Sequence, residues 1–322
     1  MIRQSVFIFF NLILRLPVWG LLALLRPLRP FRYIFLVYPG SEKDLAGYCP
    51  KWLLQTPLFK GRPTIGGIIT SNREHKVRGL VLVIPNTIAE MQANPELCRK
   101  IKLRLLRIQK LSGAVAVAMA GQMPGLFSRH GINLEDPFVG GLQGTVFSVV
   151  ETVQKLVEIH HLDKSNRFAV VGIGHMGGAV VDCLKEMGFE VAAIDIRRSR
   201  QGVLLPEESH KTLAEADLVV VLTPKGKDFA PYLNWLKPGC LVVDDTHPRL
   251  LNDNHKLKLF KVAVGLPETR FYPRLPGYQA NWLPGCVIEA IYVASQGGFM
   301  AEPIPVFIKK ARRLGYYPHL DR

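Results

Sequence analysis

The chain has 322 residues, 48% of them hydrophobic and 21% charged, which excludes an intrinsically disordered segment and a small disulfide-stapled domain. Lysine and arginine number 41 against 26 aspartate and glutamate residues, and the formal net charge of +15 favours an anionic partner. The five cysteines form no Cys-x-x-Cys pair, so we predict a cytoplasmic protein without a metal site.

The N-terminal segment is apolar and basic. Residues 5–14 and 18–25 are hydrophobic runs, but an arginine and a proline separate them, and neither has the ~20 residues that a membrane-spanning helix needs. No acidic residue precedes Glu42. This composition predicts a helical segment over residues 1–38 that lies on an anionic membrane surface, and hence a peripherally membrane-associated protein. A secretory signal and a buried helical hairpin are the alternatives.

The next part of the chain predicts a second α/β unit, a substrate lobe over residues 39–150. Residues 64–84 have the pattern of a β-hairpin, and residues 86–111 have helical spacing. Six basic residues of that helix alternate with apolar ones: Arg99, Lys100, Lys102, Arg104, Arg107 and Lys110. The basic face is either a solvated surface or a dock for an acidic carrier protein or anionic lipid. We expect a strand over residues 114–119 and a helix over about 145–160.

From Arg167 onward the chain alternates between strand-like and helical segments. Runs of strand length rich in valine and isoleucine occur at residues 168–172, 190–195, 217–222, 240–244 and 260–264. Continuous apolar strands separated by helices indicate a parallel sheet covered on both faces. The predicted fold class is therefore α/β, with a doubly wound dinucleotide-binding domain over residues 151–270 and C-terminal helices over residues 271–322.

A glycine-rich motif follows the first of these strands. Gly172, Gly174 and Gly177 come directly after the strand and open a helix, the context that a dinucleotide fingerprint requires. The first glycine permits a tight turn, the second lets the backbone approach a pyrophosphate, and the third allows close packing of the helix. The predicted cofactor-binding residues of this loop are Gly172, Ile173, Gly174, His175, Met176 and Gly177.

The residues after the next two strands bear on the choice of cofactor. Asp195 ends the second strand, where its carboxylate can bond a ribose hydroxyl and favour NAD. Arg197 and Arg198 follow directly and can hold a 2′-phosphate, which favours NADP. We predict NADPH as the cofactor, with NADH as the alternative. Thr223 and Pro224 end the next apolar strand, at the edge where a cofactor lies.

A cysteine after the dinucleotide domain is the candidate nucleophile. Cys286 follows Pro-Gly at the start of a helical pattern, where the positive end of the helix dipole stabilises a thiolate. Glu289, one turn later, can assist proton transfer or cap the helix. His247 lies in the loop after the 240–244 strand and is the candidate base. The alternatives are a buried core cysteine and a solvated loop histidine.

Several segments together resemble the long-chain acyl-[acyl-carrier-protein] reductases of the cyanobacterial alkane pathway over residues 62–315. They are ITSNREHKVRGLVLVIP, GLQGTVFSVVETVQ, AVVGIGHMGGAVV, VVDDTHPRLL and GCVIEAI. That family carries its acylated cysteine in a Cys-x-x-Glu-Ala segment, and Cys286, Glu289 and Ala290 fall on it. The resemblance implies an NADPH-dependent reduction of an acyl thioester, carried by acyl-carrier protein or acyl-CoA, to a fatty aldehyde through a Cys286 acyl-enzyme.

Two other functions are compatible with the same residues. One is an NAD(P) oxidoreductase of the shikimate or amino-acid dehydrogenase type, which needs no covalent catalysis. The other is a membrane-tethered, non-enzymatic protein that senses NAD(P). No nucleic-acid-binding module accompanies the basic stretches, so we expect no nucleic-acid partner. The oligomeric state is left open by the sequence.

Overall fold

The computed structural model describes residues 15–28, 30–39, 59–70, 77–198, 201–251, 256–298 and 302–320, with the single positions Ser5, Ile8, Phe9, Asn11, Ala46 and Thr56. The chain divides into two compact units. The first contains residues 1–144 and 266–302, and the second contains residues 145–265 and 303–322. The C-terminal region 271–322, predicted as one segment, is therefore shared between the two units.

The first unit is built on a six-stranded sheet with the order β13-β2-β3-β1-β4-β5. Its strands are β1 (Tyr33–Val37), β2 (Thr64–Thr70), β3 (Gly79–Val83), β4 (Ala116–Met119), β5 (Phe138–Val139) and β13 (Arg270–Tyr272). β3, β1, β4 and β5 run parallel, whereas β2 is antiparallel to both of its neighbours. The pairing of β2 with β3 confirms the predicted hairpin.

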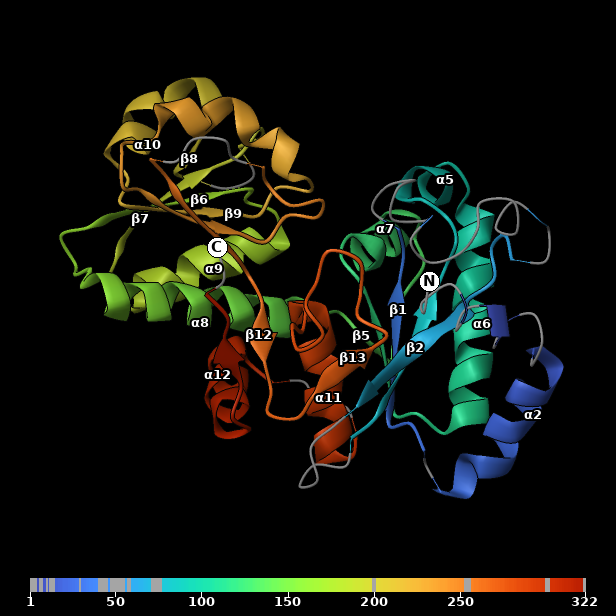
Figure 1. The fold of residues 1–322 in the computed structure, drawn as a ribbon. Helices are drawn as coiled ribbons and strands as arrows, with labels where there is room; N and C mark the ends of the chain where they lie inside the picture. Colours follow the sequence, from blue (N-terminus) through green and yellow to red (C-terminus); the bar gives the residue numbers. More distant parts are fainter. Residues whose placement is uncertain are drawn as a thin grey trace. The chain divides into compact units, whose positions relative to one another are not determined.

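Helices cover both faces of this sheet. They are α2 (Arg15–Leu25), η2 (Arg26–Leu28), α5 (Ile88–Gln92), α6 (Pro95–Ser112), α7 (Met123–Arg129) and α11 (Gly285–Gln296). Helix α6, with α2 packed on it, lies on one face, and α11 lies on the other, against β1 and β4 (Figure 1). Asn94 caps α6 through a bond from the Leu97 N–H at 3.0 Å, and Gly113 ends it in the left-handed conformation. The predicted amphipathic helix is thus confirmed.

The N-terminal segment contributes to the core of the first unit. Its strand β1 is completely buried and lies at the centre of the sheet. Val18 and Leu22 of α2 belong to the same hydrophobic core. The buried Asn11 side chain donates to the Ile65 carbonyl and accepts from the Ile65 N–H, both at 2.7 Å. Among the described residues, no helix has the length and apolar content needed to cross a bilayer.

The second unit is built on a parallel sheet with the order β11-β10-β9-β6-β7-β8. Its strands are β6 (Arg167–Val171), β7 (Glu190–Ile194), β8 (Val203–Leu204), β9 (Leu218–Val221), β10 (Leu241–Asp244) and β11 (Lys258–Lys261). The strand order reverses between β6 and β9: β7 and β8 are added on one side of β6, and β9, β10 and β11 on the other, as in doubly wound dinucleotide-binding domains. The predicted α/β class and doubly wound sheet are confirmed.

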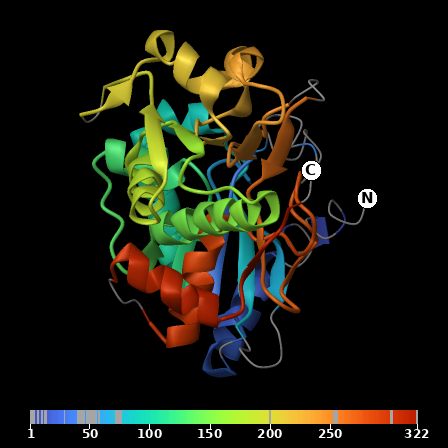
Figure 2. The ribbon, with the colours of Figure 1, turned by 90° about the vertical axis from the view of Figure 1, so that its left-hand side faces the viewer.

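Helices also lie on both faces of this sheet (Figures 1 and 2). They are α8 (Leu142–His160), α9 (His175–Glu186), η3 (Pro206–Glu208), α10 (His210–Glu215), η4 (Gly226–Asp228), η5 (Ala230–Trp235) and α12 (Ile304–Arg313). α9 packs on β6 and β7, while α10 and η5 bury Leu213 and Leu233 in a core with Val219 and Val242. A short ribbon of β12 (Val264–Gly265) and β14 (Tyr317–Pro318) completes the unit.

Candidate functional site

The glycine loop lies between β6 and α9, where the sequence predicts it. Gly172 has φ +100°, and a Cβ there would lie 2.8 Å from the Leu222 carbonyl carbon. A Cβ on Gly177 would lie 2.0 Å from the Gly172 carbonyl oxygen, so α9 packs directly on the loop. Gly174, the N-cap of α9, has no atom within 4 Å of an added Cβ. Packing therefore requires glycine at two positions, while the third leaves an open approach to the helix N-terminus that fits a pyrophosphate.

The other residues of the loop differ in exposure. Ile173 is buried at 3% exposure, and its N–H donates to the Asp195 carboxylate. His175, the first residue of α9, is exposed, and Met176 is half-buried. The first backbone N–H groups of α9 have no acceptor within the helix. They are therefore the donors that the loop offers to an anion.

The end of β7 is tied to this loop. The Asp195 carboxylate accepts from Ile173 and also from the Arg197 N–H, the latter at 3.1 Å. Arg198 forms an exposed ion pair with Glu208, and Arg197 is exposed beside it. Asp195 thus holds the glycine loop through these bonds, and the guanidinium groups of Arg197 and Arg198 follow it within three residues. Its predicted contact with a ribose hydroxyl stays a prediction.

A network of buried polar groups holds the loop after β10. The Asp244 carboxylate accepts from the Thr246 N–H at 2.8 Å, from the Thr246 hydroxyl at 2.5 Å and from the Leu250 N–H at 3.0 Å. The Lys261 ammonium, on β11, donates to the Thr246 carbonyl at 2.5 Å and lies 3.9 Å from Asp244 Oδ2. Because both charged side chains are buried and bonded, the loop is held in one arrangement.

The loop after β9 packs against the β10 loop. Thr223 donates through its hydroxyl to the Lys225 carbonyl at 3.0 Å, and Pro224 is exposed. The Gly226 N–H donates to the Pro248 carbonyl at 3.0 Å, and a Cβ on Gly226 would lie 2.2 Å from the Leu250 nitrogen. The predicted residues Thr223, Pro224 and His247 therefore belong to two loops in direct contact.

Asp245, two residues before the half-buried His247, is a candidate that the sequence did not single out. Burial raises the pKa of the Asp245 carboxyl to about 7; the neighbouring Asp244 adds to the rise and Lys261 opposes it. A carboxyl with such a pKa exchanges protons at neutral pH. The signal in the sequence was an aspartate directly after a buried strand that itself ends in Asp244, at the carboxyl edge of the predicted sheet.

Cys286 and Glu289 belong to the first unit, whereas the glycine loop belongs to the second. Cys286 is half-buried in the first turn of α11, as predicted, and Glu289 is 6% exposed one turn later. The Glu289 carboxylate accepts from the Gln143 N–H at 3.0 Å and the Gly144 N–H at 3.5 Å. Burial raises the pKa of Glu289, and these backbone donors oppose the rise. Glu289 therefore caps the N-terminus of α8.

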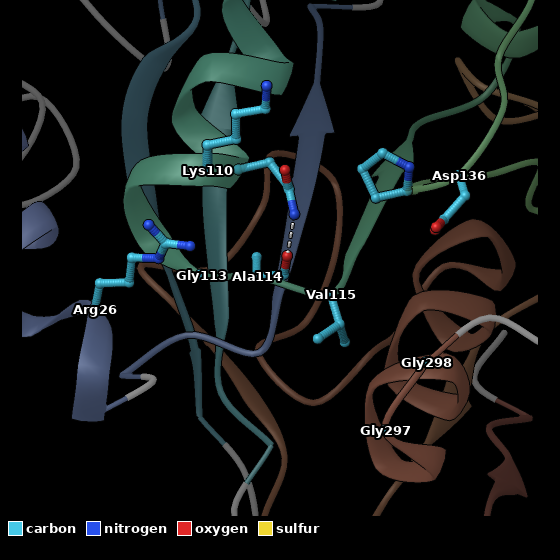
Figure 3. Close-up of a pocket in the computed structure, with 10 residues that line it drawn as sticks. Arg26, Lys110, Gly113, Ala114, Val115, Asp136, Gly297 and Gly298 are labelled. Atoms are coloured by element: carbon cyan, nitrogen blue, oxygen red, sulfur yellow. Dashed lines mark hydrogen bonds between the residues drawn. The ribbon is translucent and has the colours of Figure 1, made fainter.

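A cavity of about 500 Å³ lies in the first unit, beside the residues that lead into β4. It is lined by Arg26, Gln109, Lys110, Gly113, Ala114, Val115, Asp136, Pro137, Gly297 and Gly298. Figure 3 shows the Arg26 and Lys110 side chains beside Gly113, with the Gln109 amide donating to the Ala114 carbonyl at 2.6 Å. Lys110 of the predicted basic face lines this cavity, whereas none of the predicted catalytic or cofactor-binding residues does. In the described part of the chain, no group of three His, Cys, Asp or Glu side chains could hold a metal ion.

The doubly wound sheet and its glycine loop define a dinucleotide-binding domain. Residues 151–235 match the family model of the D-isomer specific 2-hydroxyacid dehydrogenase, NAD binding domain. This match confirms a nicotinamide dinucleotide as the cofactor of this domain. No curated protein matches the chain.

Three solved structures of hydroxyacid dehydrogenases or reductases show some similarity to this chain. A D-isomer specific 2-hydroxyacid dehydrogenase family protein from Klebsiella pneumoniae 342 is 15% identical over 87% of this chain and 92% of that chain, with a TM-score of 0.36. An NADPH-dependent glyoxylate/hydroxypyruvate reductase from Sinorhizobium meliloti is 17% identical over 32% and 52%, with a TM-score of 0.25. A D-isomer specific 2-hydroxyacid dehydrogenase from Xanthobacter autotrophicus Py2, in complex with NADPH and MES, is 23% identical over 38% and 63%, also with a TM-score of 0.25. The chain thus spans about half of the Sinorhizobium protein.

The family match corrects the resemblance to acyl-[acyl-carrier-protein] reductases. The predicted reduction of an acyl thioester to an aldehyde through a Cys286 acyl-enzyme is wrong, and so are the predicted acyl-carrier protein, acyl-CoA and anionic membrane partners. The physical reason is that a glycine fingerprint reports the cofactor and not the substrate. The Cys-x-x-Glu segment has a structural explanation as well, because Glu289 is bonded to the backbone of α8.

Proposed function

We propose that the chain is an NAD(P)-dependent oxidoreductase that interconverts a small 2-oxo acid and the corresponding 2-hydroxy acid by direct hydride transfer. The match of residues 151–235 to a 2-hydroxyacid dehydrogenase NAD-binding domain carries this proposal. The open backbone at Gly174 supports it, because the loop presents unobstructed N–H groups to a pyrophosphate. No acyl-enzyme is involved.

We assign different parts of the cofactor and the substrate to different residues along the carboxyl edge of the second unit's sheet. The bound cofactor supplies the hydride. The start of α9 holds its pyrophosphate, and Asp195 and the arginines after β7 lie at its ribose end. The loops after β9 and β10 lie on the other side of β6, toward the nicotinamide end. There the exposed Arg249 offers a positive charge to a substrate carboxylate, and His247 lies two residues from it.

Turnover of 2-oxo acids tests the reaction class. The full-length protein should oxidise NADPH or NADH in the presence of small 2-oxo acids such as glyoxylate or pyruvate, followed by the loss of nicotinamide absorbance. The Cys286→Ser variant should keep kcat within about threefold of the wild type, because hydride transfer needs no thiol nucleophile. Absence of turnover with every 2-oxo acid, or loss of all turnover in a folded C286S protein, would contradict the proposal.

The two arginines after β7 should set the choice between NADPH and NADH. Replacing Arg197 and Arg198 together with alanine removes two donors for a 2′-phosphate, each worth about 1.5–3 kcal/mol when bonded to the charged group. We expect the Kd of NADPH to rise at least tenfold and that of NADH to stay within about twofold. Nicotinamide fluorescence titrations measure both constants.

A matched control is Lys211→Ala, which removes an exposed cation from α10 in the same unit. This variant should bind both cofactors as the wild type does. Equal losses for NADPH and NADH in the double-arginine variant would show that these side chains do not contact the 2′-phosphate.

A further inference from the structure

We propose that the cavity beside the start of β4 binds a small aminodicarboxylic acid, with Arg26 and Lys110 holding its two carboxylates and Asp136 holding its ammonium group. All of the lining residues of this cavity belong to the first unit. The glycine loop and the loops after β9 and β10, which serve the proposed function, belong to the second unit. The inference therefore goes beyond the proposed function and does not depend on it.

The cavity lies at the amino end of the parallel strands of the first sheet. Val115 and Pro137 line it, and they directly precede β4 and β5. Gly113 and Gly297, the C-caps of α6 and α11, line it as well. In open α/β sheets the crevice for cofactor and substrate lies at the opposite, carboxyl end of the strands. A ligand in this cavity would therefore occupy a separate site.

Four backbone N–H groups of the lining loops already have acceptors. Those of Gly113 and Val115 donate to carbonyl groups at 2.9 and 2.8 Å. Those of Gly297 and Gly298 donate to carbonyl groups of α11 at 3.4 and 3.1 Å. The donors that these loops leave to a ligand are therefore the charged side chains beside them.

Arg26 and Lys110 make one side of the cavity positive. Both side chains are exposed, and neither has an acidic partner among the described residues. Arg26 packs against the end of α6, because a Cβ on Gly113 would lie 3.1 Å from Arg26 Cγ. Guanidinium and ammonium groups form charge-assisted hydrogen bonds with carboxylates. This side of the cavity therefore fits the two carboxylates of a ligand.

The other side of the cavity is negative. Asp136, Gly297 and Gly298 lie across the Ala114–Val115 segment from the two cations (Figure 3). Asp136 is exposed and has no basic partner in the part of the chain that the structure describes. The C-terminus of α11, the negative end of its dipole, is at Gly297. A Cβ added to either glycine would have no atom within 4 Å, so this side has room for an ammonium group.

The charges and size of the cavity match an aminodicarboxylate. Two cations and one carboxylate give the lining a net charge of +1. At neutral pH the ligand has two carboxylates and one ammonium group, and hence a net charge of −1. The volume of about 500 Å³ is typical of small-molecule pockets and leaves room for bridging water. Because the charged side chains are exposed, binding should weaken as salt is added.

Calorimetric titration of the cofactor-free, full-length protein with L-glutamate tests the site. We expect one site with a Kd of about 1 mM or tighter at low salt, and a Kd at least tenfold higher for the double variant R26A/K110A. The matched control is R99A/K100A, which removes the same charge from the other end of α6, where both side chains pair with Glu96. This control should bind L-glutamate as the wild type does. Absence of binding to the wild type, or an unchanged Kd in R26A/K110A, would overturn the proposal.

Glutarate, which has both carboxylates and no ammonium group, tests the role of Asp136. It should bind the wild type about tenfold more weakly than L-glutamate does. Asp136→Asn should remove this difference, because a neutral amide does not favour a cation. If glutarate or inorganic phosphate binds the wild type as tightly as L-glutamate, the cavity is a general anion site and the proposal is wrong. Absence of 2-oxo acid turnover would refute the proposed function and leave these binding results unchanged.

Discussion

Replacing Gly177 with alanine should weaken NADPH binding about 100-fold and destabilise the second unit by about 1–3 kcal/mol. The added Cβ would lie 2.0 Å from the Gly172 carbonyl oxygen, so α9 must move away from the loop after β6. Both partners of this contact are backbone, and no rotamer change can relieve it. Because the same loop and helix N-terminus hold the pyrophosphate, we expect the Kd of NADPH to rise about 100-fold, which corresponds to about 2.7 kcal/mol.

Gly174→Ala provides the matched control for this variant. Gly174 has φ −73°, and an added Cβ has no atom within 4 Å. Its stability should therefore stay within about 1 kcal/mol of the wild type. Cofactor affinity should still fall, because the methyl group points into the space that a pyrophosphate needs. Chemical denaturation and fluorescence titration separate the two effects, and wild-type behaviour of both properties in G177A would refute the close helix–loop packing.

The second unit could be predicted from sequence because its signals are local. A parallel strand buried on both faces is a continuous apolar run, and β6, β7, β9 and β10 all have this pattern. The glycine loop is equally local, since strand, turn and helix follow one another within residues 167–186. Each of these elements can therefore be recognised from a short stretch of the sequence.

The first unit could not be predicted to the same extent, because its sheet joins distant segments. The strand β1 pairs with β3 and β4, which lie about 46 and 83 residues further along the chain, taking Tyr33 with Gly79 and Ala116. An apolar run such as β1 has the same composition whether it enters a core or a membrane. The last part of the segment predicted as membrane-associating, Tyr33–Val37, is therefore a central strand, and its composition alone did not distinguish the two outcomes.

The candidate site shows the same division between local and distant information. The glycine loop and Asp195 could be selected from spacing, whereas the pKa of Asp245 depends on burial and on Lys261, a residue of the next strand. Likewise, Glu289 was selected as a partner of Cys286, but its hydrogen-bond donors are Gln143 and Gly144, about 145 residues earlier. Long-range contacts of this kind decide what a side chain does and leave no local pattern.

Glu289→Ala should destabilise the first unit by about 2–4 kcal/mol. The Glu289 carboxylate accepts from the Gln143 and Gly144 N–H groups, which have no helical acceptor because they lie in the first turn of α8. Alanine leaves the buried Gly144 donor and the half-buried Gln143 donor without this partner, at about 1–3 kcal/mol for each buried donor. Hydrogen exchange at these two amides should accelerate, and denaturant unfolding should give the overall change. Glu158→Ala, at an exposed position of the same helix, should change stability by less than about 0.5 kcal/mol.

The pH dependence of this effect has a defined sign. Burial raises the pKa of Glu289 in the folded protein, so the native state binds the proton more readily than the unfolded chain does. The contribution of this group to stability is then fully present below the unfolded pKa of about 4.3 and decreases as the pH rises through the folded pKa. Glu289→Gln cannot ionise and keeps one carbonyl acceptor for the α8 amides. The stability advantage of the wild type over E289Q should therefore shrink with rising pH, and a growing advantage would show that the ionised carboxylate, stabilised by the helix N-terminus, is the favoured native form.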